Sequence, residues 1–205
     1  MPERRDKPPI GATEPPDLVG DDPVEVDAEA LAEARELEGV ALAGTVLDGT
    51  DLRGLRLVDV RGERVSATSG DWRAAGLQRV ELREARLTGL DLGEAKLREA
   101  RFVGCKLDYA NFRFAAVEYV SFEDCVLVRA DFQGAKLTSV RFEGCQLGEA
   151  DFTKATLDRV DFRGSDVAGL GGSLLGLRGA IVDSLQLMDL SPQLAAELGI
   201  AVEQA

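Results

Sequence analysis

Large apolar residues recur at every fifth position along most of this chain, and this period constrains the fold more than any other feature. In the stretch ADFQGAKLTSVRFEGCQLGEADF, residues 130–152, they are Phe132, Leu137, Phe142, Leu147 and Phe152. A β-strand repeats its faces every two residues and an α-helix every 3.6, so neither places residues five apart on one side. The period therefore predicts a backbone in which each group of five residues is a separate unit.

The period runs from Leu42 to Leu187 without a change of phase. Of the 30 positions in this series, 27 hold Leu, Phe, Val or Trp, and the exceptions are Gly62, Ala67 and Gly172. The residue two positions before each is usually small or β-branched. One large and one small inward residue in every five predicts a narrow tube with a filled interior.

The phenylalanines indicate how many residues form one coil. They fall into two series with a step of 20, offset from each other by 10: Phe102, Phe122, Phe142 and Phe162, and Phe112, Phe132 and Phe152. A coil of 20 residues with four sides of five places the two series on opposite walls. Ten repeat units end in glycine, which fits corners that require positive φ. Seven and a half coils at a spacing of ~4.8 Å predict a tube roughly 36 Å long.

The stretch RGERVSATSGDW, residues 61–72, is the weakest part of the pattern. Two large positions are replaced there by Gly62 and Ala67. We expect a bulge or a locally collapsed wall in this stretch, with no long insertion because the period resumes in phase.

Residue usage argues against catalysis and against a metal or cofactor site. The chain has no histidine, which removes the commonest general base and the commonest zinc ligand. Its three cysteines, Cys105, Cys125 and Cys145, lie 20 apart at the small inward position, where a free thiol behaves as a small apolar group. We expect reduced, buried cysteines, no cofactor and no enzyme activity.

The chain divides into four segments. Residues 1–26 hold six of the seven prolines and many acids, a composition typical of a disordered tail. Residues 27–38, DAEALAEARELE, predict a short capping helix with Asp27 as N-cap. The repeats occupy 39–188. Residues 189–205 predict a second helix, with Ser191 as N-cap and Pro192 at its first position, and a short apolar tail.

The net charge of −13 is concentrated outside the repeats. Residues 1–38 hold twelve acids and four bases, whereas residues 39–188 hold 22 acids and 20 bases. An acidic chain lacks the phosphate attraction that dominates nucleic-acid affinity, so we expect no direct nucleic-acid binding. No apolar run approaches the ~18 residues of a membrane span, and the first residues lack the apolar core of a secretory signal. We expect a cytoplasmic protein that does not contact membranes.

The pattern resembles the pentapeptide-repeat family, whose motif reads roughly Ala-Asp/Asn-Leu/Phe followed by two free positions. Matches include ANFRF at 110–114, ADFQG at 130–134 and ADFTK at 150–154. The resemblance covers about 150 of the 205 residues. It implies an all-β solenoid, a right-handed quadrilateral β-helix, with short capping helices at both ends.

One outward column in this register is almost entirely acidic. It contains the residue before each large position on one wall: Asp51, Asp71, Asp91, Asn111, Asp131 and Asp151. This acidic ladder carries about one acid per ~4.8 Å, somewhat sparser than the phosphates of a DNA strand. Two interpretations remain open, because Asp or Asn here is also the family consensus and can satisfy backbone groups at the corners.

The C-terminus resembles those of the quinolone-resistance pentapeptide-repeat proteins, in which such a helix and tail form a tail-to-tail dimer. On this resemblance we expect a homodimer through Leu194, Leu198, Ile200 and Val202. The same resemblance implies a non-enzymatic DNA mimic that binds a type II topoisomerase, DNA gyrase or topoisomerase IV, and protects it from quinolones or toxins. The alternative is a general protein-interaction scaffold with another partner.

Overall fold

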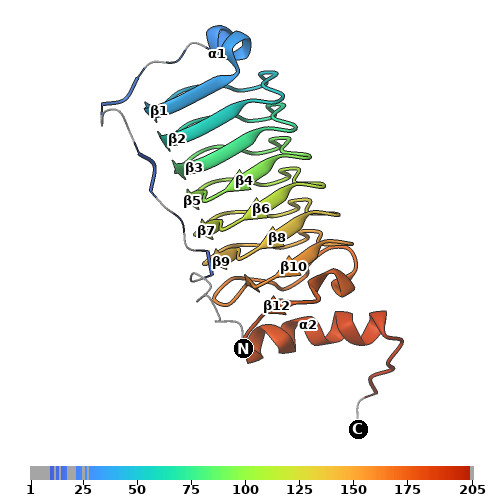
Figure 1. Ribbon diagram of the computed structural model, residues 1–205. Helices are drawn as coiled ribbons and strands as arrows, with labels where there is room; N and C mark the ends of the chain where they lie inside the picture. Colours follow the sequence, from blue (N-terminus) through green and yellow to red (C-terminus); the bar gives the residue numbers. More distant parts are fainter. Residues whose placement is uncertain are drawn as a thin grey trace, which may run out of the picture.

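The computed structural model describes residues 10–11, 13, 15–17, 22–24, 26 and 28–203. The chain winds as a parallel β-solenoid, with coils stacked into a straight rod between a helix at each end (Figure 1). The predicted all-β solenoid is therefore confirmed. Its elements are α1 Ala28–Ala34, β1 Glu36–Ala43, β2 Arg56–Glu63, β3 Gly76–Arg83, β4 Lys96–Arg98, β5 Arg101–Val103, β6 Ala116–Glu118, β7 Ser121–Glu123, β8 Lys136–Thr138, β9 Arg141–Glu143, β10 Thr156–Asp158, β11 Val160–Asp161, a 3-10 turn η1 Leu174–Leu177, β12 Ala180–Ile181 and α2 Ser184–Glu197.

Each residue pairs with the residue 20 positions further along the chain. This offset holds from Leu57↔Leu77 to Phe122↔Phe142, and it continues through the bridges Asp51↔Asp71 and Asp131↔Asp151. The coil length inferred from the phenylalanines is thus correct. β1, β2 and β3 are long enough to cross a corner, so β3 pairs with both β4 and β5 and joins two walls in one sheet.

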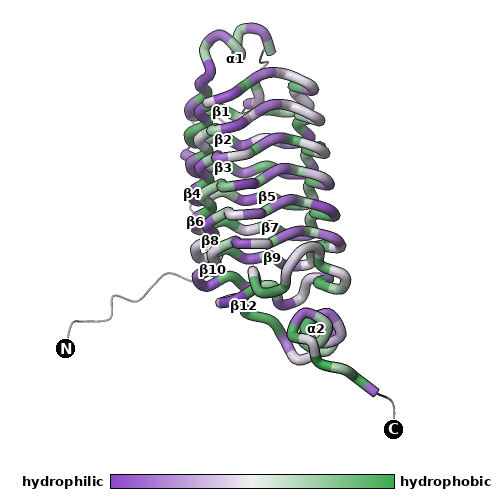
Figure 2. The backbone as a smooth tube through the Cα atoms, turned by 90° about the vertical axis from the view of Figure 1, so that its right-hand side faces the viewer, coloured by the Kyte–Doolittle hydropathy of each residue, from purple (hydrophilic) through white to green (hydrophobic). Residues whose placement is uncertain are grey.

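We number the four walls by their inward residues. Wall 1 contains β4, β6, β8 and β10, and wall 2 contains β5, β7, β9 and β11. Wall 3 carries Leu87, Leu107, Leu127 and Leu147, and wall 4 carries Leu92, Phe112, Phe132 and Phe152. Figure 2 shows the hydrophilic outer positions of the same coils.

The interior is filled by the two phenylalanine series. Phe112 and Phe132 stack with ring centroids 4.6 Å apart, and Phe102 and Phe122 stack at 5.0 Å. The two series meet edge to face, as in the 5.9 Å contact between Phe132 and Phe142. Both arrangements are favourable for aromatic rings. Most of the large and small inward positions are buried as the pattern predicted, but at the C-terminal end Leu177 and Val182 are half-buried and Leu187 is exposed.

The corners require a left-handed backbone at every fifth residue. All ten glycines predicted at corners have positive φ, for example Gly104 at 62° and Gly134 at 68°. Non-glycine residues take the same conformation at other corners, including Asp59, Arg129 and Phe114. The solenoid therefore imposes this conformation regardless of residue type.

The bulge expected in residues 61–72 is absent. Ser66 and Asp71 bridge in register to the coils on both sides. A side chain at Gly62 would collide with Leu82 and Val65, so those neighbours already occupy its inward space. Trp72 is buried with its indole close to Gly70. Larger neighbours replace the missing volume, and the wall keeps its shape.

The helices at the two ends differ from their predicted bounds. The helix expected over 27–38 ends at Ala34, because Arg35 adopts φ 53° and Glu36 begins pairing with Arg56. The expected N-cap Asp27 lies outside the described residues.

α2 begins at Ser184 rather than at Pro192, and the repeats end before Leu187, which lies in α2 with its side chain exposed. The N-cap is Asp183, which forms a capping box with Gln186. The signal Ser191-Pro192 suggested a helix start, but the stronger cap lies upstream and Pro192 is inside the helix.

Parts of the N-terminal segment lie against the rod. The backbone N–H of Gly11 donates to the carbonyl of Ser139, that of Asp17 to the carboxylate of Asp59, and that of Val24 to the carbonyl of Ala41. These described residues therefore contact walls 1 and 2 over several coils. Most of the segment expected to be disordered lies outside the described residues.

Within the described ranges, no helix has the length and apolar character needed to cross a membrane.

Candidate functional site

The acidic ladder forms one continuous outer column on wall 4. Each member bridges to the next through parallel pairing, and the column ends at Gly171. One side-chain oxygen of every member accepts the backbone N–H two residues later, from Arg53 on Asp51 (3.2 Å) to Thr153 on Asp151 (2.7 Å). Asn111 makes the same bond with Arg113, at 2.9 Å. The ladder thus stabilises the corner backbone, which sequence alone left as one of two interpretations.

The second oxygen of several ladder members binds a cation on the same wall. Arg53 lies 2.6 Å from Asp51, and Arg73 lies 2.6 Å from Asp71. Arg53 and Arg73 also approach the next member of the ladder, at 3.7 Å each. Hydrogen bonds from Arg53 lower the pKa of Asp51 to about 2, and those from Arg73 lower the pKa of Asp71. Arginines therefore partly neutralise the N-terminal half of the ladder.

In the C-terminal half of the ladder, one carboxylate is bound by an arginine and the other by a neutral amide. Arg113 binds Asp131 at 2.6 Å, and the amide of Gln133 donates to Asp151 at 2.5 Å. Burial opposes ionisation of Asp151, but hydrogen bonds from Thr153 and Gln133 prevail and lower its pKa. Negative charge is therefore least compensated near the end that is closer to α2.

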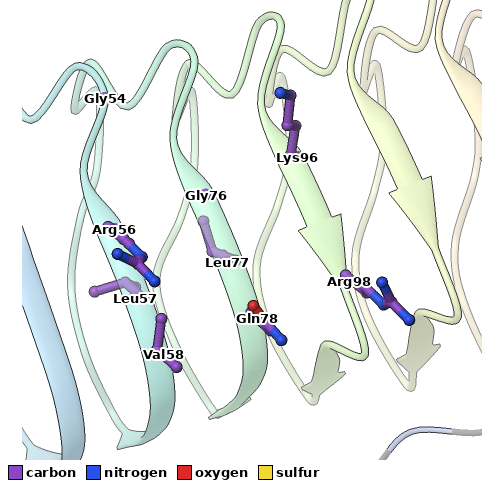
Figure 3. A pocket seen from close by; sticks show the side chains of 9 residues that line it. All are labelled: Gly54, Arg56, Leu57, Val58, Gly76, Leu77, Gln78, Lys96 and Arg98. Atoms are coloured by element: carbon purple, nitrogen blue, oxygen red, sulfur yellow. The ribbon is translucent and has the colours of Figure 1, made fainter.

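Wall 1 carries a shallow groove with cations at its edges. The groove has a volume of about 350 Å³ and lies over β2, β3 and β4. Figure 3 shows Arg56 on β2, Gln78 on β3, and Lys96 and Arg98 on β4 around the position of Gly76. Because Gly76 has no side chain, the column that contains Arg56 and Lys96 is interrupted there. The sequence analysis did not identify this groove, although the column Arg56, Gly76, Lys96, Ala116, Lys136 was readable from the 20-residue step.

α2 closes the end of the tube through polar and apolar contacts. The side-chain amide of Gln186 donates to the backbone carbonyls of Phe162 (2.7 Å) and Ser165 (2.8 Å) in the last coil. Leu190 is buried against the last coil, and Leu194 packs beside it. The buried capping residues are thus Gln186 and Leu190, whereas Leu198 is exposed.

The outer face of α2 and the tail beyond it are apolar and open to solvent. Ile200 is 56% exposed and Val202 is 79% exposed. Further apolar side chains are exposed in the same region: Leu185, Leu187, Met188 and Leu198. Of the four predicted interface residues, Leu194 is half-buried within the chain and the other three face outward.

The cysteines occupy the inward position as expected. Cys105, Cys125 and Cys145 are buried free thiols in three consecutive coils. The neighbouring thiols and burial raise the pKa of the Cys125 thiol. Among the described residues, no group of three or more His, Cys, Asp and Glu side chains is arranged to hold a metal ion.

Comparison with known proteins agrees with the fold. The model of the family described as "Pentapeptide repeat region" matches residues 75–152 and 95–171. No curated protein sequence matches the chain.

One solved structure of low sequence identity shares the fold. QnrB1, a plasmid-mediated fluoroquinolone resistance protein, aligns with a TM-score of 0.50 at 21% identity, over 82% of this chain and 90% of that one. Rfr23, a pentapeptide repeat protein from the cyanobacterium Cyanothece 51142, aligns with a TM-score of 0.45 at 17% identity, over 76% and 96%. The matched repeats lie in unbroken register with the rest of the stacked coils, and residues 75–171 of this chain are a pentapeptide-repeat region.

Proposed function

We propose that this chain is a non-enzymatic, protein-binding rod that acts on a type II topoisomerase, DNA gyrase or topoisomerase IV. The observation that carries the proposal is the filled interior: the inward positions are buried side chains, so recognition falls to the outer walls and the ends. A solenoid of this kind offers an extended, rigid surface to a protein partner.

The mechanism under this proposal is DNA mimicry by wall 4. The acidic ladder presents a carboxyl side chain in five of its six coils, at the coil spacing of ~4.8 Å, along one column. A topoisomerase surface that binds DNA phosphates would meet carboxylates instead. The fold likeness to a fluoroquinolone resistance protein supports the choice of partner.

A general protein-interaction scaffold is the second candidate, and one observation favours it. Every ladder member uses an oxygen to bind the corner backbone, and Arg53, Arg73 and Arg113 compensate much of the charge. Under this interpretation the ladder is structural and the partner contacts another wall.

Asn111 provides a clean test of the ladder. Because Asn111 keeps the backbone hydrogen bond without a charge, Asp→Asn changes should leave the fold intact. We would combine Asp91→Asn, Asp131→Asn and Asp151→Asn and measure gyrase supercoiling, with and without a fluoroquinolone, at increasing protein concentration.

The wild type should inhibit supercoiling or protect the enzyme from the drug, and the triple variant should lose this effect. A matched control removes three exposed acids from other walls, Glu84→Gln, Glu118→Gln and Asp158→Asn, and should behave as wild type. No effect of the wild type at tens of micromolar would refute the topoisomerase partner. An effect retained by the ladder variant would refute mimicry by wall 4.

The proposal includes a homodimer through the C-terminus. Pairing the outer face of α2 and the tail of two chains would bury the exposed Leu198, Ile200 and Val202. Ile200→Asp combined with Val202→Asp should give a folded monomer, because Gln186 and Leu190 still close the tube. Sedimentation equilibrium should give about twice the 22.0 kDa chain mass for the wild type, and a wild-type mass of one chain would refute the dimer.

A further inference from the structure

Phe114 is the most exposed aromatic side chain described on the rod. It lies at the corner between walls 4 and 1 and is 68% exposed, at φ 59°. Small or charged residues occupy the same left-handed column in other coils: Gly54, Ala74, Glu94, Gly134 and Lys154. The fold therefore does not require a phenyl group at this corner.

The phenyl ring is held in place rather than free. Gly134 lies at the same corner in the next coil. A Cβ atom added to it would lie 2.6 Å from Cε1 and 2.7 Å from Cδ1 of Phe114. The ring thus lies over Gly134, in space that any other residue at position 134 would fill. Single exposed apolar residues are normal on protein surfaces, so exposure alone has no meaning here. Whether the ring belongs to a binding site depends on the residues near it.

Three lysines lie in the same corner column as Phe114 or in the adjoining outer column of wall 1. Lys96 and Lys136 are the wall 1 residues that pair with Ala116, two positions after Phe114, from the coils on either side. Lys154 occupies the same corner column two coils further along. All three are exposed, and none forms an ion pair with another described residue.

The arginines of the rod differ from these lysines in their ion pairing. Most arginines of the repeats are paired with carboxylates, such as Arg113 with Asp131, Arg129 with Glu149 and Arg101 with Glu123. Lys96, Lys136 and Lys154 are therefore cations on the columns next to Phe114 that no described carboxylate compensates. The carboxylates on the neighbouring positions are those of Glu94, at the same corner one coil earlier, and Glu118 on β6.

We propose that Phe114, Lys96, Lys136 and Lys154 form a docking site for an extended acidic segment of a partner protein that carries an apolar side chain. The apolar side chain would cover the exposed phenyl ring, and carboxylates on either side of it would pair with the lysines. The groove over β2–β4 begins at Lys96, which gives the segment room to continue toward Arg56. This site lies beside wall 4, and it does not depend on the topoisomerase proposal.

Single-stranded nucleic acid is the other ligand that aromatic and cationic groups can bind. The observations favour a protein segment, because the site offers one phenyl ring rather than a series of stacking platforms. The nearby Glu94 and Glu118 also oppose a backbone that carries a negative charge at every residue. A peptide with a few carboxylates places its charges opposite the lysines alone.

Fluorescence anisotropy with three labelled ten-residue peptides tests the proposal on the full chain. The first has a central Leu-Phe pair with two Asp or Glu residues and two Ser residues on each side; the second has Gly-Gly at the centre; the third has Lys in place of each acid. We expect the first peptide to bind with a Kd on the order of 100 μM, the second at least fivefold more weakly, and the third not at all. Labelled oligothymidylate should not bind.

Two variants should weaken the first peptide at least tenfold: Phe114→Gly, and the combination of Lys96→Glu, Lys136→Glu and Lys154→Glu. Lys106→Glu is the control, because Lys106 is exposed on wall 3 and forms no ion pair with another described residue. This variant should bind the first peptide with the affinity of the wild type. Phe114→Gly suits the left-handed corner, so its thermal midpoint should stay within about 2 °C of the wild type or rise.

No binding of the first peptide at millimolar protein, equal affinity of the first two peptides, or tighter binding of oligothymidylate would each overturn the proposal.

Discussion

Replacing Phe132 by Ala tests whether the rod is stabilised from inside as the structure indicates. The side chain is fully buried in the middle of wall 4. It stacks on Phe112 at 4.6 Å and Phe152 at 4.8 Å, and Phe142 meets it edge to face at 5.9 Å. Three aromatic contacts are lost at once when the ring is removed.

The expected loss of stability is large because the surrounding coils have little freedom to collapse into the cavity. A buried Phe→Ala change typically costs about 3–5 kcal/mol, and each aromatic pair adds roughly 0.5–1.5 kcal/mol beyond its buried area. The backbone N–H of Phe132 donates to the backbone carbonyl of Asp151 at 2.8 Å, and that of Phe112 donates to the backbone carbonyl of Asp131 at 2.7 Å. These bonds fix the distance between coils. We therefore expect the upper end, about 5 kcal/mol.

Urea unfolding followed by circular dichroism measures this loss. Phe132→Leu should cost only about 1–1.5 kcal/mol, because Leu52 and Leu92 fill the same inward column in other coils. Phe114→Ala, which removes a phenyl group from the surface of the same region, should change the free energy of unfolding by less than about 1 kcal/mol. A loss below about 1 kcal/mol for Phe132→Ala would refute the assigned register.

Three further predictions concern the thiols, the carboxylates and the N-terminal segment. Cys125 should resist thiol reagents in native buffer and react only on unfolding, because it is buried and its pKa is raised; rapid labelling of the native protein would contradict the assignment. Hydrogen bonds from arginines lower the folded-state pKa of Asp51 to about 2 and that of Asp59 below its usual value, so their contribution is present above about pH 4 and lost as the pH falls toward 2. The urea midpoint should accordingly fall on acidification below about pH 4, and a midpoint that rises there would argue against these ion pairs. Deleting residues 1–26 should leave a cooperative unfolding transition, with a lower midpoint because the contacts of Asp17 with Asp59 and of Val24 with Ala41 are lost; loss of cooperativity would show that the coils need this segment to fold.

The sequence by itself determined the coil, its register and its filled interior. Each coil repeats the same local rule, so a residue such as Phe132 has the same neighbours as its counterparts 20 positions away. In a solenoid, contacts follow from the period, and a pattern in one dimension specifies the packing in three. The buried cysteines and the left-handed glycine corners followed from the same rule.

Only the tertiary structure decided what happens where the repetition stops or varies. The wall stays continuous past Gly62 and Ala67, because the larger side chains of Trp72, Leu82 and Val65 fill the space. Packing depends on the total volume of the inward side chains and not on each position separately. α2 starts at Ser184 because its Gln186 satisfies the carbonyls of the last coil, a contact between residues more than 20 positions apart. The charge of the acidic ladder was likewise readable from the sequence, but its compensation was not, because side-chain hydrogen bonds depend on which neighbours reach each oxygen in space.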